Sequence, residues 1–151
     1  MLLKTKYSTV YPAGTVQIGG AKYFRFQAQG NLTGPQAIQR FLPAGSTPAA
    51  ISNSKTNPQT SDGSVFAAQV LALRLNVDFS NSGVLPSGLS NLKLNTTKLS
   101  GWKVFDVLSL ANLVLGGNPP PAGISISDLN FSVTTINENF DNGGNKGNLV
   151  P

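Results

Sequence analysis

The chain of 151 residues contains no cysteine and no histidine, and only six of its side chains are carboxylates. Without cysteine there is no disulfide bond, no thiolate nucleophile and no cysteine-ligated zinc. Histidine is the most frequent general acid or base near neutral pH and the commonest metal ligand. These absences exclude most familiar catalytic and transition-metal sites. We therefore predict that the protein is not an enzyme, with no catalytic residues and no cofactor.

Uncharged polar residues are abundant instead, with 15 Asn, 15 Ser and 11 Thr beside 16 Gly and 10 Pro. The chain is 40% hydrophobic and only 11% charged, which is typical of a globular protein. A chain of this length most simply forms one domain over residues 1–151, with residues 1–12 as an N-terminal β arm and residues 144–151 as a C-terminal tail. This composition favours a bacterial protein located outside the cell or at its surface.

The formal net charge of +5 arises from few acids rather than from a cluster of bases. The 11 Lys and Arg residues are scattered, and no nucleic-acid-binding motif accompanies them. No stretch approaches the ~18 apolar residues of a membrane-spanning helix. We therefore predict neither a nucleic-acid partner nor membrane insertion.

The first part of the chain alternates β-favouring runs with turn residues. Residues 5–11, 15–18 and 22–28 are rich in β-branched and aromatic side chains, and glycines separate the last two runs. We predict β-strands between about residues 5 and 28. Residues 44–63 are rich in Gly, Ser, Thr, Pro and Asn, which predicts a long loop that is either held by contacts or functional.

Helical patterns follow in three places, and a fourth segment, residues 64–78, fits either a helix or a strand. Thr33 and Pro35 predict the start of a helix over about residues 35–42. Apolar residues at helical spacing predict helices over about residues 102–115 and 127–141, the last with Ser127 as its N-cap. These strands and helices together predict an α+β fold.

The segment 64–78 fits two periodicities. Its composition favours a helix, but residues 71–79 alternate between apolar and polar side chains as a strand does. We predict a helix over 64–78, and the choice between helix and strand for residues 71–79 stays open.

The six carboxylates are Asp62, Asp78, Asp106, Asp128, Glu138 and Asp141. No spacing singles out two of them as a glycosidase pair. Asp106 and Asp128 fall in first turns of predicted helices, where a carboxylate stabilises the exposed amides. The segment from Asn137 to Asp141 gathers oxygen atoms but lacks the glycine and the closing acid of a calcium loop. We predict no metal site, with calcium near residues 137–141 as an open alternative.

Four blocks of sequence follow one another in a recognisable order: FLPAGSTP at 41–48, VFAAQVLALRLNVDFS at 65–80, VFDVLSLANLVLGG at 104–117 and ISDLNFSVTTINENFDNG at 126–143. This order resembles an uncharacterised family of bacterial secreted and cell-surface modules. The resemblance spans about two thirds of the chain. It implies an extracellular location and no known catalytic activity. It assigns no active-site residue to this chain.

Two function classes fit these observations. The first is a structural subunit of a surface filament or layer that assembles with copies of itself, through addition of the N-terminal arm as a strand to a neighbouring sheet. The second is an adhesion or carbohydrate-binding module that recognises surface glycans. The arm could equally pair within its own subunit. The residues predicted to carry self-assembly are Leu2, Leu3, Tyr7, Val10 and Tyr11.

Overall fold

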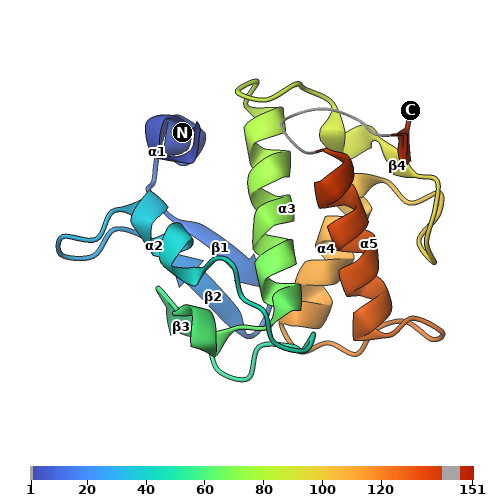
Figure 1. Cartoon of the computed structure of the whole chain (residues 1–151), viewed down its shortest axis with the longest axis horizontal. Helices are drawn as coiled ribbons and strands as arrows, with labels where there is room; N and C mark the ends of the chain where they lie inside the picture. The colour runs from blue at the N-terminus through green and yellow to red at the C-terminus, as the bar shows by residue number, and fades with distance from the viewer. Residues whose placement is uncertain (1, 141–146) are drawn as a thin grey trace.

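The computed structural model describes residues 2–140 and 147–151, and in this part of the chain it shows helices together with short strands in two small sheets (Figure 1). The α+β class predicted from the sequence is confirmed. The helices are α1 (Leu2–Val10), α2 (Gly34–Phe41), α3 (Val65–Asn81), α4 (Val104–Leu115) and α5 (Ile126–Asn139). The strands are β1 (Val16–Gly19), β2 (Tyr23–Phe26), β3 (Lys55–Thr56), β4 (Lys93–Leu94) and β5 (Leu149–Val150).

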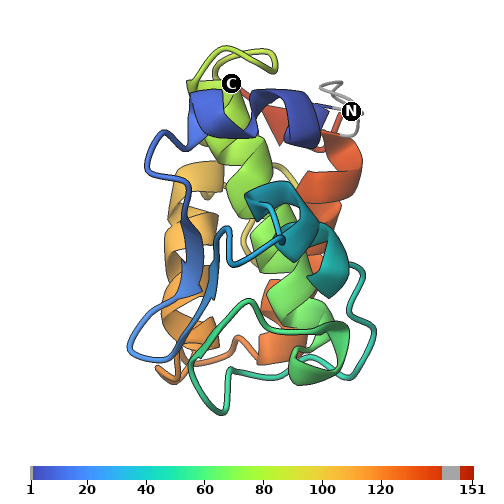
Figure 2. The same cartoon turned by 90° about the vertical axis from the view of Figure 1, so that its left-hand side faces the viewer.

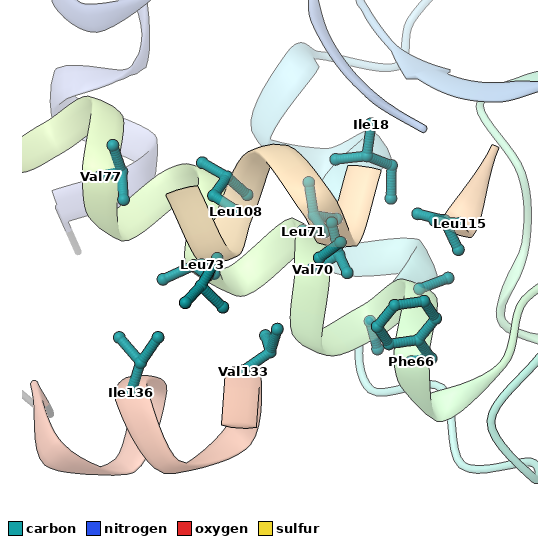
Figure 3. Close-up of a cluster of buried hydrophobic side chains, with 14 of the residues drawn as sticks. Ile18, Phe66, Val70, Leu71, Leu73, Val77, Leu108, Leu115, Val133 and Ile136 are labelled. Atoms are coloured by element: carbon teal, nitrogen blue, oxygen red, sulfur yellow. The ribbon is translucent and has the colours of Figure 1, made fainter. Parts of the chain in front are cut away.

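Helix α3 is the centre of the domain. It packs against α4, α5 and β1, and its side chains Val70, Leu71 and Leu73 are fully buried (Figure 3). Because neighbours cover α3 on several sides, its apolar residues are not confined to one stripe. This explains why two periodicities fit the segment, and residues 71–79 are helical.

The larger sheet covers one side of this helical core. Strands β1 and β2 are antiparallel, and β3 adds to β2 in parallel. Phe24 and Phe26 point inward from β2 and meet the ring of Phe41 on α2, with ring centroids 5.6 and 5.3 Å from that ring. The strands predicted for residues 15–18 and 22–28 are therefore confirmed.

The strand predicted for residues 5–11 is wrong, since this segment lies within helix α1 up to Val10. Tyr7 and Tyr11 are four residues apart, so a helical turn brings both rings to one side, with centroids 5.2 Å apart. Both rings are buried against the rest of the domain. Packing of these two rings outweighs the weak β preference of the segment. Figure 2 shows α1 lying crosswise to α3.

The helix starts follow their capping residues. Thr33 caps α2 with Gln36 as its reciprocal partner, as expected for the helix predicted at 35–42. Ser127 is not the cap of α5, and that prediction is wrong. Ser125 accepts a hydrogen bond from the Asp128 backbone N–H, while the Asp128 carboxylate accepts one from the Ser125 N–H. The reciprocal pair starts α5 at Ile126, and of the predicted range 127–141 only residue 141 lies outside the described residues.

Helix α4 begins at Val104 rather than at residue 102, because the chain before it pairs with β4. The Leu94 N–H donates to the Trp102 carbonyl, and the Val104 N–H donates to the Leu92 carbonyl. These bonds hold residues 102 and 103 in extended backbone beside β4. The helix predicted over 102–115 is otherwise confirmed.

Contacts with the core hold the long loop and the end of the chain. In the loop, Asn57 is buried and its side-chain oxygen accepts from the Gln27 N–H, while the Ile51 N–H donates to the Leu115 carbonyl. Within the predicted tail 144–151, the described residues include β5, which pairs with β4. None of the described helices has the length and hydrophobicity needed to cross a membrane.

Candidate functional site

The five residues predicted to carry self-assembly all lie on α1 or directly after it, and α1 folds back onto its own domain. Tyr7 and Tyr11 are buried, and Leu3 and Val10 are partly buried against the core; Leu2 begins the helix. The Cα of Gly34 faces the Tyr7 ring so closely that a Cβ there would lie 2.5 Å from Cε2. The segment is thus a packed helix and not an exposed β arm, which corrects the predicted arm at residues 1–12.

A polar network anchors the end of α1. The Tyr11 hydroxyl donates to Asp78 Oδ2 at 2.7 Å, and Arg74 Nε donates to the same oxygen at 2.6 Å. Arg74 Nη1 also donates to the Gln17 carbonyl at 2.9 Å, which ties β1 to α3. Burial raises the pKa of the Tyr11 hydroxyl, and the nearby Asp78 carboxylate raises it further. Tyr11 therefore stays a protonated donor at neutral pH, and the network has a structural role.

Two further carboxylates accept hydrogen bonds from backbone N–H groups at helix starts, Asp62 from Gln59 and Asp128 from Ser125. Asp62 pairs with Lys55 at 2.6 Å, and the hydrogen bond from this lysine lowers the pKa of Asp62. The Ser125 backbone N–H lowers the pKa of Asp128, which also pairs with Lys98 at 3.1 Å. In the described part of the chain, no three His, Cys, Asp or Glu side chains gather where they could hold a metal ion.

Two side-chain oxygens of the suspected calcium segment have partners within the protein. Asn137 Oδ1 accepts from Asn76 Nδ2 at 3.1 Å, and Asn139 Oδ1 accepts from the Asn148 N–H at 2.9 Å. These bonds join α5 to α3 and to the end of the chain. Asp141 lies outside the described residues, so the calcium alternative is untested.

Exposed apolar side chains concentrate on α4. Phe105 is 56% exposed and Leu113 is 50% exposed, while the neighbouring Trp102 and Leu110 are only partly buried. We call these four residues the α4 surface. Trp102 lies just before α4, and the other three fall outside the buried stripe that packs α4 on the core. Apolar residues off that stripe were therefore the sequence signal for this surface. This surface was not predicted, because the prediction for residues 102–115 rested on the stripe alone.

A small, exposed residue separates the two exposed apolar side chains of the α4 surface, and its hydroxyl makes a hydrogen bond within the helix. Ser109 lies between Phe105 and Leu113, and its hydroxyl donates to the Phe105 carbonyl at 3.0 Å. Beside this row lies a hollow of about 580 Å³, lined by Trp102 and Leu113 among others. Lys103 and Asp106 contribute charges of opposite sign to the hollow. The surface therefore combines exposed apolar side chains, a hollow, and side chains of both positive and negative charge.

A second exposed aromatic residue lies on α5. Phe131 is 63% exposed and borders a hollow of about 730 Å³ that is also lined by Gln69, Thr135 and Glu138. An exposed ring beside amide, hydroxyl and carboxylate groups is a combination that suits a sugar. Asn137 lines the same hollow, but its amide group donates to the backbone and side chain of Gln69.

Comparison of the chain with protein-family models, with curated proteins and with solved structures finds no match. The resemblance to bacterial surface modules stays a prediction. Function is therefore inferred from the two exposed surfaces and from the composition.

Proposed function

We propose that this protein is a non-catalytic structural protein that associates with copies of itself outside the cell or at its surface. The α4 surface carries this proposal, because two half-exposed large apolar side chains lie on a single helix of the domain. Contiguous exposed apolar patches mark interaction sites more often than scattered ones do. The extracellular setting rests on the composition and on the resemblance to bacterial surface modules.

A second copy is a suitable partner for this surface. Lys103 and Asp106 place both signs of charge on it, so two copies can meet there without opposing only like charges. Burying the exposed halves of Phe105 and Leu113 contributes about 1 kcal/mol or slightly more per side chain. Association is therefore weak and depends on protein concentration.

The test is a measurement of mass against concentration. We expect the weight-average mass of the wild-type protein, measured by sedimentation equilibrium, to rise above the monomer mass at high micromolar concentrations. Replacing Phe105 and Leu113 together by serine removes the apolar contact and is expected to keep the protein monomeric throughout. Phe131→Ser is the matched control, since this ring is equally exposed on another helix. A wild-type protein that stays monomeric over the whole range contradicts the proposal.

The hollow beside Phe131 supports carbohydrate binding as a second candidate function. The exposed ring offers a stacking surface, and the Glu138 carboxylate beside it accepts hydrogen bonds from sugar hydroxyls. We expect binding on a glycan array with and without calcium, and we expect Phe131→Ala to weaken it at least tenfold. Phe105→Ala, on the other candidate surface, is the control. No binding to any glycan would contradict this second function.

A further inference from the structure

We infer that α4 pairs with the α4 of a second copy in antiparallel orientation, with the two helices crossing at Ser109. The inference rests on the proposed self-association and specifies its geometry. Identical chains usually associate about a two-fold axis, where residue i of one copy contacts residue j of the other and the reverse contact is equivalent. A surface suited to this arrangement is symmetric about its own centre.

The exposed apolar residues of α4 have this symmetry. Phe105 and Leu113 are each four residues from Ser109, which is about 6 Å along the helix axis on either side. In an antiparallel pair centred at Ser109, Phe105 of each copy lies opposite Leu113 of the other. The contact between Phe105 and Leu113 then forms twice, and no exposed large apolar side chain of α4 is left without a partner.

Ser109 is suited to the crossing point. Its small side chain allows two helix axes to approach closely, within the usual range of about 8–10 Å. Its hydroxyl donates to the Phe105 carbonyl at 3.0 Å within its own helix. Burial of a hydroxyl is costly mainly when its hydrogen bond is lost. Ser109 therefore enters the interface with its hydrogen bond retained.

The hollow on the α4 surface offers space for a side chain of the second copy. Residues 105, 109 and 113 form a row at i, i+4 and i+8, and rows of this kind pack into the grooves of a partner helix at a crossing angle of about 50°. Leu110 and Leu113 line the hollow on one side of this row, whereas Phe105 is not among its lining residues. The ring of Phe105 from one copy can therefore enter the hollow of the other.

The charges favour the antiparallel orientation over the parallel one. A parallel pair would set Lys103 beside Lys103 and Asp106 beside Asp106 of the second copy. In the antiparallel pair, each Lys103 is six residues from the crossing point, so the two ammonium groups are about 18 Å apart along the axis. This exceeds the Debye length of about 8 Å at physiological ionic strength, and the repulsion is screened.

Cysteine cross-linking tests this geometry, because the native chain has no cysteine. A disulfide needs two Cα atoms closer than about 7 Å. In the proposed pair, only the residue at the crossing point has its Cα this close to the Cα of the same residue in the second copy. We expect Ser109→Cys to form a covalent dimer under mild oxidation at high protein concentration. Ser127→Cys, at an exposed position on α5, is the control and is expected to stay at least tenfold less cross-linked.

Two further variants determine the orientation. An equimolar mixture of Phe105→Cys and Leu113→Cys is expected to yield the mixed dimer, identified by intact mass spectrometry, in severalfold excess over either homodimer. Homodimers of Phe105→Cys in excess would show a parallel pair and overturn the inference. If sedimentation shows dimers but Ser109→Cys does not cross-link, this geometry is wrong while self-association stands. If the wild type is monomeric, the proposed function fails first.

Discussion

Replacing Gly116 by alanine is expected to lower the free energy of unfolding by roughly 3 kcal/mol. Gly116 ends α4 where the turn between β1 and β2 crosses it, and the Lys22 N–H donates to the Gly116 carbonyl at 3.1 Å. A Cβ at Gly116 would lie 2.6 Å from the Cα of Gly20 and closer still to the Gly20 nitrogen. Both are backbone atoms, so the overlap can be relieved only by moving the turn away from α4.

Gly20→Ala is the matched control, because it adds a methyl group on the other side of the same contact. A Cβ at Gly20 would have its nearest neighbour at 3.6 Å, an ordinary van der Waals distance. The backbone of Gly116 itself suits alanine, with φ of −78°, so the expected loss is due to contact and not to conformation. Urea denaturation of both variants measures the difference. Equal stability of the two would show that the turn moves freely.

Ser80→Ala is expected to destabilise the fold by about 2 kcal/mol. Ser80 is fully buried near the end of α3, where its hydroxyl donates to the Pro86 carbonyl at 2.7 Å and accepts from the Leu89 N–H at 3.2 Å. Alanine leaves the buried Leu89 N–H without a partner. An unsatisfied buried donor costs more than an average hydrogen bond contributes, since water cannot reach it.

Ser82→Ala is the control for this prediction. Its hydroxyl donates to the Phe79 carbonyl at 2.9 Å, but the residue is exposed, so water replaces the lost group. We expect a loss below about 0.5 kcal/mol. Urea denaturation measures both variants, and amide hydrogen exchange at Leu89 reports the local effect. Unchanged exchange at Leu89 in Ser80→Ala would refute the assigned role.

The geometry proposed for α4 limits what self-association can build. A two-fold contact closes on itself and produces a dimer. Growth into a filament or layer needs a second contact on another face.

The N-terminal segment shows why part of this fold could not be predicted locally. Its β-branched and aromatic residues predicted a strand, yet Tyr7 and Tyr11 lie at the i, i+4 spacing of a helix face. Whether the segment forms a strand or a helix depends on what these two rings pack against. Tyr7 packs closely against Gly34, and Tyr11 donates to the Asp78 carboxylate. Both partners are distant in sequence.

The sequence alone determined the α+β class and the main helices, because capping residues and apolar stripes act within a few positions along the chain. Thr33 and the stripe of α4 are examples, and both predicted their helices to within a residue or two. Only the tertiary structure decided that α3 is helical to its end, that α1 is a packed helix, and that Phe105 and Leu113 remain uncovered. Exposure depends on which neighbours cover a side chain, and those neighbours are brought together only by folding.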